Sequence, residues 1–161
     1  MAHFAELKQK QDPTGFTDNQ LWVVERVVVV GNDVSTADGA LGDNDMHADG
    51  EAWCSNFFKG GTWKQTSYNN NFRKQYCGMG MVYDYSKDKF LSQQPHASWS
   101  LDDNDDWKAP VTYPTITTYG DPVKPYIINW DEAGQKWTAT DYSDPVNNFN
   151  WDASELTWVS V

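Results

Sequence analysis

The sequence has 161 residues, a size that one compact domain accounts for. Twelve Lys and Arg against 23 Asp and Glu leave a formal charge of −11, which disfavours binding to nucleic-acid phosphates and to anionic membranes. No apolar run approaches the roughly 20 residues that a membrane span needs. We therefore expect one acidic domain, residues 1–161, whose partner is neither nucleic acid nor a membrane.

Aromatic residues are abundant. Nine Trp, eight Tyr and seven Phe make up 15% of the chain, and they occur together with Asn, Asp, Gly and Pro. Aromatic side chains suit pleated, half-buried surfaces, and the accompanying residues are typical of turns. The composition predicts a mainly β fold, with antiparallel hairpins forming a small sheet or sandwich.

The first part of the chain predicts a β-hairpin over residues 2–30. Residues 22–30 are apolar and mostly β-branched, interrupted only by Glu25 and Arg26, which favours a central strand. A first strand near residues 3–7 would pair with it across the polar connection 8–19. Residues 31–50 contain five Asp and no Lys or Arg, so we expect an acidic loop there.

One short helix is predicted over residues 51–59. Asp49 can cap its N-terminus, and the pair Gly60-Gly61 would end it. Trp53, Phe57 and Phe58 fall on one side of such a helix. We expect the helix to dock on the sheet through these rings.

Repeated aromatic hairpins are predicted over residues 78–161. Three times, an aromatic residue followed by Asp precedes a second aromatic residue by seven positions: Tyr83 and Phe90, Trp130 and Trp137, Trp151 and Trp158. If the rings face each other across antiparallel strands, each hairpin has a four-residue loop, a favoured length. The inner pairs would then be Asp84 with Lys89, Asp131 with Lys136, and Asp152 with Thr157. Trp99 and Trp107 form a looser version with a spacing of eight.

Proline-containing stretches at 93–95, 109–114 and 121–125 are expected to separate the hairpins, because proline lacks a donor for a central ladder.

A further strand is predicted at the first aromatic repeat. Residues 78–85 alternate like a strand, which predicts that Met79, Met81, Tyr83 and Tyr85 share one core-facing side.

No residues stand out as catalytic or as holding a cofactor. Cys54 and Cys77 have no metal-ligand spacing, and because residues 1–10 lack the apolar core of a secretion signal, we expect two separate reduced thiols. His3, His47 and His96 show no ligand pattern. The chain has no nucleophile motif, and nothing nominates a carboxylate pair for glycoside hydrolysis. We expect no enzyme, no cofactor and no metal, with calcium at the acidic clusters 43–51 and 102–106 as the open alternative.

The tryptophans allow two interpretations. Packing in a thin core is favoured for each of them taken alone, including Trp107, Trp130, Trp137, Trp151 and Trp158. As a group, some are expected at a contact surface, where Trp and Tyr are enriched. We nominate Trp107, Trp137 and Trp158 as contact residues.

Several segments resemble small virion proteins of marine cyanobacterial phages. These are residues 1–5, the Val-rich strand, the block 60–69 (Gly-Gly-Thr-Trp-Lys-Gln-Thr-Ser-Tyr-Asn), the run 78–90, the stretch 99–114 and residues 130–132. The chain departs from these proteins in its acidic loop 31–50 and in an additional C-terminal segment, 141–161.

The resemblance implies a non-enzymatic virion structural protein, most similar to the knob-like decoration type. It would sit on the capsid surface, bound to the major capsid protein of the phage, with the loops 31–50 and 102–106 facing solvent. Two alternatives remain open: a tail-associated protein, and an adhesion module that binds host-surface polysaccharide with Trp side chains as platforms.

Overall fold

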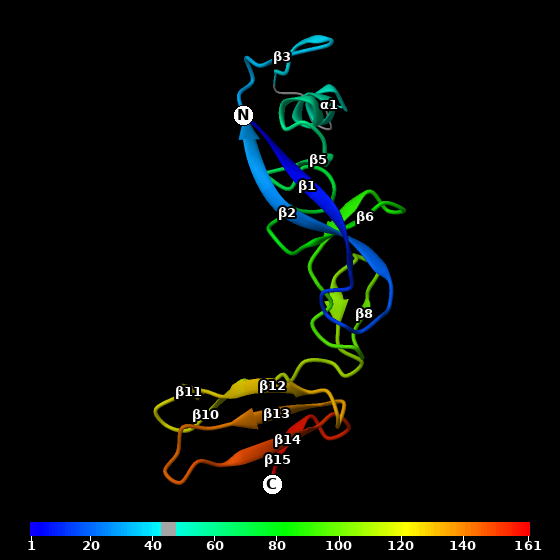
Figure 1. Ribbon diagram of the computed structural model, residues 1–161. Coiled ribbons are helices and arrows are strands. Elements are labelled where there is room, and N and C mark those ends of the chain that lie inside the picture. Colours follow the sequence, from blue (N-terminus) through cyan, green and yellow to red (C-terminus); the bar gives the residue numbers. More distant parts are fainter. Residues whose placement is uncertain (43–47) are drawn as a thin grey trace. The chain divides into compact units, whose positions relative to one another are not determined.

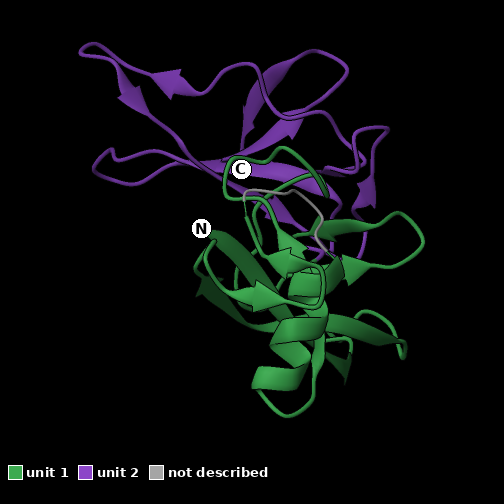
Figure 2. Ribbon diagram, turned by 90° about the horizontal axis from the view of Figure 1, so that it is seen from above, with its two compact units in different colours: residues 1–93 green, residues 94–161 purple. Residues whose placement is uncertain are grey.

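The computed structural model describes residues 1–42 and 48–161, so the predictions that involve Asp43, Asp45 and His47 lie outside it. The chain is mainly β, as predicted, with antiparallel sheets and one short helix in the described residues. It divides into two compact units, residues 1–93 and 94–161 (Figure 2). A single domain over residues 1–161 stays a prediction.

The first unit contains a curled five-stranded antiparallel sheet in the order β5-β1-β2-β6-β7 (Figure 1). Its strands are β1 (Ala2–Gln11), β2 (Gln20–Val30), β5 (Thr62–Thr66), β6 (Val82–Asp84) and β7 (Lys89–Leu91). The predicted N-terminal hairpin is therefore confirmed, with a longer first strand than expected. The second strand is central, because it pairs with β1 on one side and β6 on the other.

Both faces of this sheet carry core residues. Phe4 packs on one face with Leu41, Cys54 and Trp63, while Leu7 packs with a second cluster that includes Phe90. A bulge between Glu6 and Leu7 shifts the pairing of β1 with β2. Bulges increase strand twist, which fits the curled shape of the sheet.

The predicted acidic loop contains more structure than expected. Within it, two strands of two residues each, β3 (Ser35–Thr36) and β4 (Gly39–Ala40), form a short antiparallel hairpin. The helix α1 (Ala48–Phe57) begins before the predicted start at residue 51. Asp49 consequently lies in the first helical turn and does not cap the helix, although a carboxylate in this turn still interacts favourably with the helix dipole.

The helix ends near the predicted glycines, but a lysine adopts the left-handed conformation. Lys59 has φ of 59°, and its N–H donates to the carbonyl of Asn56. The N–H of Gly60 donates to the carbonyl of Ser55 at 2.7 Å, which completes a Schellman-type end.

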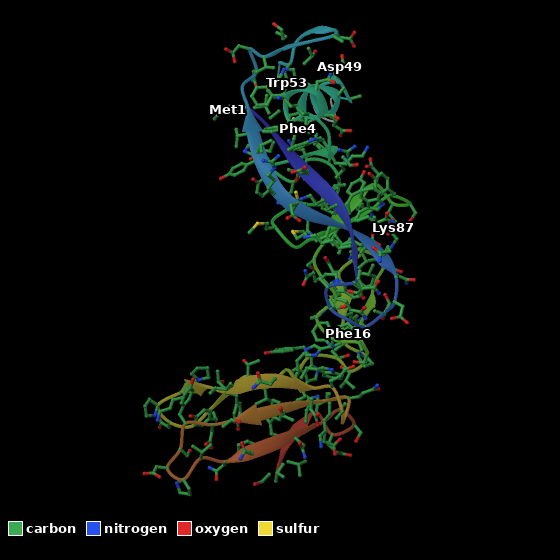
Figure 3. All side chains as sticks on the ribbon, viewed as in Figure 1. Met1, Phe4, Phe16, Asp49, Trp53 and Lys87 are labelled. Carbon is green, nitrogen blue, oxygen red and sulfur yellow. The ribbon has the colours of Figure 1, made fainter. Side chains whose placement is uncertain are left out.

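Docking of the helix follows the prediction in part. Trp53 and Phe58 pack against the core around Phe4, and Phe4 and Trp53 lie at the same end of the first unit (Figure 3). Phe57 is exposed but stacks on Trp53 with ring centroids 4.7 Å apart. Two of the three rings therefore pack on the core, and the third packs on one of these two rings.

The predicted core-facing stripe at residues 79–85 was wrong for two of its members. Residues 78–81 form a turn, closed by the N–H of Met81 donating to the carbonyl of Gly78, so the strand starts only at Val82. Met79 and Tyr85 are exposed, whereas Tyr83 is buried and Met81 packs against the core. The turn interrupts the alternation that a continuous strand would have given.

The second unit is built on a four-stranded antiparallel sheet with the order β12-β13-β14-β15. The strands are β12 (Ile127–Asp131), β13 (Lys136–Thr140), β14 (Asn148–Asp152) and β15 (Thr157–Ser160) (Figure 1). One face is aromatic. Trp130, Trp137 and Trp151 pack there with Ala109 from a preceding segment.

Four short strands precede this sheet. The pair β8 (Ser100–Leu101) and β9 (Trp107–Lys108) forms one hairpin, and β10 (Thr118–Tyr119) and β11 (Lys124–Pro125) form another. The proline stretches 93–95 and 109–114 contain no strand, as predicted. The third stretch, 121–125, instead forms the turn and outer strand of the β10–β11 hairpin.

The register of all three aromatic repeats is confirmed. Tyr83 faces Phe90, Trp130 faces Trp137 and Trp151 faces Trp158. The predicted inner pairs also face each other, including Asp84 with Lys89 and Asp131 with Lys136. The fourth residue of each loop has positive φ: Asp88 at 51°, Gln135 at 46° and Leu156 at 51°.

The Asp of the repeat has a second role that charge pairing did not predict. The Oδ1 of Asp84 accepts hydrogen bonds from the backbone and hydroxyl of Ser86. Asp152 accepts the equivalent bonds from Ser154. These Asx turns hold the loops in shape. Because of the Ser154 bonds, the pKa of Asp152 lies below its ordinary value.

The looser repeat does not pair as predicted. Trp107 faces Leu101, so Trp99 and Trp107 are not opposite each other. The N–H of Asp102 donates to the carbonyl of Asp106 at 2.9 Å, which closes the hairpin in this register. Trp99 instead packs edge-on against Trp137, with centroids 5.9 Å apart.

In the acidic loop 102–106, which we expected to face solvent, Asp105 is buried and has φ of 60°.

Candidate functional site

The three tryptophans nominated as contact residues have different environments. Trp137 exposes only 7% of its surface and its indole N–H donates to the carbonyl of Val111 at 2.9 Å, so it is a core residue. Trp107 and Trp158 are half-buried. The indole N–H of Trp158 donates to the carbonyl of Ile116 at 2.7 Å. Core packing is confirmed for Trp130, Trp137 and Trp151, and contact roles for Trp107 and Trp158 stay predictions.

The second unit contains an open apolar groove of about 370 Å³. One wall is part of the segment 110–115, including Pro110 and Tyr113, and the other wall is the β14–β15 turn. Trp151 contributes to the lining from β14. The ring of Tyr113 is held edge-on against Trp137 at 4.9 Å, which positions it beside the groove.

Leu156 is the unusual residue of this groove. It occupies the left-handed position of the β14–β15 turn, where Asp88 and Gln135 stand in the other two repeats. A leucine at positive φ costs backbone energy, and this one remains 57% exposed, so folding recovers little of that cost by burial. Tyr113 on the opposite wall is 52% exposed. Two exposed apolar side chains thus border the groove.

Charge is distributed unevenly between the units. Residues 94–161 contain eleven Asp and Glu and three Lys, a formal charge of −8, whereas residues 1–93 contain twelve acids and nine bases, a formal charge of −3. Glu155, next to Leu156 in the turn, is exposed. The groove therefore belongs to the strongly acidic unit.

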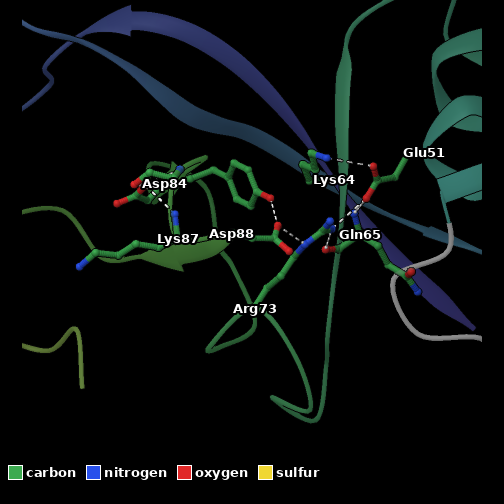
Figure 4. Close-up of polar contacts among 9 residues, drawn as sticks. Glu51, Lys64, Gln65, Arg73, Asp84, Lys87 and Asp88 are labelled. Atoms are coloured by element: carbon green, nitrogen blue, oxygen red, sulfur yellow. Dashed lines mark hydrogen bonds and ion pairs between the residues drawn. The ribbon is translucent and has the colours of Figure 1, made fainter. Parts of the chain in front are cut away.

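The first unit contains a buried network of charges (Figure 4). Arg73 exposes 6% of its side chain and donates to Glu51 and to Asp88, each at 2.8 Å. Glu51 also accepts from the Gln65 backbone at 2.9 Å and from Lys64 at 3.3 Å. The network thereby ties the helix, the strand β5 and the β6–β7 turn together.

The charged and polar groups of this network interact with one another. Burial works to lower the pKa of Arg73, but the hydrogen bond and the charge of Glu51 outweigh it and raise the pKa. Burial also raises the pKa of Tyr83, whose hydroxyl donates to Asp88. Each of these polar groups is engaged within the protein. We therefore interpret the network as a structural cross-link.

An aromatic cluster lies on the surface of the first unit. The ring of His3 stacks on Tyr68 with centroids 5.4 Å apart, and Tyr76 contacts both rings edge-on. Val29, opposite His3 in the β1–β2 ladder, is exposed. Burial and the nearby N-terminus lower the pKa of His3. The cluster is a second candidate contact surface.

Both cysteines are free and buried, in agreement with the expectation of two separate thiols. Burial raises the pKa of Cys54 to about 12 and that of Cys77 to about 11. In the described ranges, no three His, Cys, Asp or Glu side chains gather closely enough to hold a metal ion. The described part of the chain also has no helix of the length and apolar character that crossing a bilayer requires.

The sequence reasoning missed the groove, although one signal was present. Of the three seven-residue repeats, only the third has an aliphatic residue at the fourth loop position, Leu156. This leucine, which is both apolar and at a left-handed loop position, is what distinguishes the third turn from the other two. Comparison with known proteins adds no constraint, since no family model, no characterised protein and no solved structure matches the chain.

Proposed function

We propose that the protein is a non-enzymatic structural component of a phage particle, a knob-like decoration of the capsid surface attached to the major capsid protein. The resemblance of segments in both units to cyanobacterial phage virion proteins supports this assignment. The observation that carries it is Leu156, exposed and at positive φ in the wall of an apolar groove.

The groove suits attachment by an apolar side chain of the partner. Tyr113 and Leu156 would lose their exposed apolar surface when such a side chain inserts between them. Burial of apolar surface stabilises a complex by roughly 25 cal/mol per Å². The formal charge of −8 on this unit favours a capsid surface that carries Lys or Arg around the inserted side chain.

Cryo-electron microscopy of particles tests the location, and reattachment to particles that lack the protein tests the groove. We expect density for this chain on the capsid. We expect Leu156→Asn to reduce its occupancy severalfold, because asparagine removes the apolar wall while suiting positive φ. Val123→Asn, at another exposed apolar residue of this unit, is the matched control and should leave occupancy unchanged.

Density on the tail alone would contradict the capsid assignment and favour the tail-associated alternative. Full reattachment of the Leu156→Asn variant would exclude the groove as the contact, while leaving the capsid assignment to the microscopy.

A further inference from the structure

We propose that the non-aromatic face of the β12–β15 sheet binds a neutral polysaccharide through asparagine and threonine side chains. This face is opposite the tryptophan core of the second unit. The strand register places Asn129 beside Thr138 and Thr138 beside Asn150, in one row across three strands. Thr140 and Asn148 form a second row. The inference is independent of the capsid assignment.

The residues of this face are accessible. Asn129 and Asn148 are exposed, and Thr138, Thr140 and Asn150 are half-buried. Neighbouring strands lie about 4.8 Å apart, and alternate residues along a strand are about 7 Å apart. The five side chains therefore form a regular array of amides and hydroxyls.

Stability of the sheet does not explain the asparagines on this face. Asparagine is depleted in β-strands, yet β12 and β14 together place three asparagines on this one face. Valine or threonine would suit the strands better. The asparagines therefore contribute something other than stability of the sheet.

Much of the hydrogen-bonding capacity of the array is free for a ligand. The Thr140 hydroxyl donates to Asn148 Oδ1 at 3.0 Å, which orients that amide. The Thr138 hydroxyl is 3.3 Å from the carbonyl of Asn129. Within residues 1–42 and 48–161, no hydrogen bond engages the side-chain amides of Asn129 and Asn150.

Sugar hydroxyls match this chemistry. Each hydroxyl donates and accepts, as does each amide and threonine side chain, so adjacent groups of the array can bond adjacent hydroxyls of a glycan. The formal charge of −8 on the unit disfavours uronate, sulfate and phosphate groups. Exposed Ile127 and Val159 flank the rows and can contact the C–H groups of sugar rings. A neutral polysaccharide is therefore the class that fits.

Retention of the purified protein in native gels that contain polysaccharide tests the proposal. The neutral probes are dextran, amylose, mannan and galactan, and polygalacturonate is the anionic comparison. We expect retention by at least one neutral probe and none by polygalacturonate. Asn129→Val and Asn150→Val should each weaken retention about tenfold, as the loss of a good hydrogen bond predicts. Asn19→Val, in an exposed loop of the first unit, is the control.

Melting temperatures separate loss of binding from loss of folding. Valine has the higher β-propensity, so both variants should melt at or above the wild-type temperature. Absence of retention by every neutral probe would overturn the proposal, as would variants retained like wild type. Sedimentation showing a dimer that Asn150→Val dissociates, without polysaccharide binding, would also overturn it and would assign the face to a second copy of the chain.

Discussion

Trp130 lies directly opposite Trp137 across the β12–β13 hairpin, with ring centroids 5.1 Å apart and ring planes at 68°. The same facing arrangement recurs for Trp151 and Trp158, at 5.0 Å and 65°. Edge-to-face contacts of this kind add to the stabilisation that burial alone provides. The second unit therefore depends on these ring pairs for its core.

The Trp130–Trp137 contact should be measurable by a double-mutant cycle. Trp130→Leu and Trp137→Leu keep the positions apolar but remove the ring contact. We expect the two changes in unfolding free energy to be non-additive, with a coupling of about 0.5–1.5 kcal/mol. Urea unfolding of the wild type, both single variants and the double variant measures this. Strict additivity would mean that the rings contribute only their buried area.

Loss of Arg73 should destabilise the first unit strongly. Arg73→Met removes the buried guanidinium from Glu51, which keeps its contact with Lys64. Leaving a buried charge fully unpaired costs about 3–5 kcal/mol, so we expect a loss of about 2–3 kcal/mol here. Lys10→Met is the matched control, since Lys10 pairs with Glu25 but exposes 47% of its side chain. An exposed pair contributes about 0–1 kcal/mol. Equal effects in urea unfolding would contradict the structural role of the network.

The Leu156→Asn variant should be more stable than the wild type even though it weakens attachment. Asparagine tolerates positive φ better than leucine does, and Leu156 is exposed. We expect a gain of about 0.5–1 kcal/mol in the free energy of unfolding. Thermal and urea unfolding of the isolated protein measure it. A clear loss of stability would show that Leu156 supports the fold of the turn.

Stability should fall in acid partly through Asp141. Its carboxylate accepts hydrogen bonds from the side chain and backbone of Asn147 and from the Ser143 backbone, which lower its pKa to about 2 against the opposing effect of burial. The unfolded value is about 3.9. Because the folded pKa is depressed, the stabilisation is complete above about pH 4 and is lost as the pH falls towards 2.

Urea midpoints at pH 6, 4 and 2.5 check this prediction. Asp141→Asn should reduce the difference between the wild-type midpoints, because it removes the titrating group. Glu155→Gln, which changes an exposed carboxylate, should keep most of that difference. An unchanged acid dependence in Asp141→Asn would assign the effect to other carboxylates.

Both thiols should be unreactive in the folded protein. Cys54 and Cys77 are buried, and burial raises the pKa of each well above 8.5, so the nucleophilic thiolate is scarce at neutral pH. Ellman's reagent at pH 8 should titrate two thiols in denaturant and react far more slowly with the native chain. Fast reaction of either thiol without denaturant would place it at the surface.

Features that depend on local spacing were determined by the sequence itself. The seven-residue interval between aromatic residues specified the register of three hairpins, because the number of loop residues decides which side chains face each other. Turn residues and apolar runs located the first hairpin. The composition was sufficient for the fold class and for the acidic character of the chain.

Burial was decided only by the tertiary structure. Trp137 and Leu156 both occur in aromatic hairpins, yet packing from the segment 110–115 encloses the first and leaves the second at an open groove. Arg73 meets Glu51 and Asp88 across 22 and 15 positions of the sequence. Which face of a strand is covered depends on segments that are distant in the sequence. The local pattern of side chains therefore cannot predict which residues become buried.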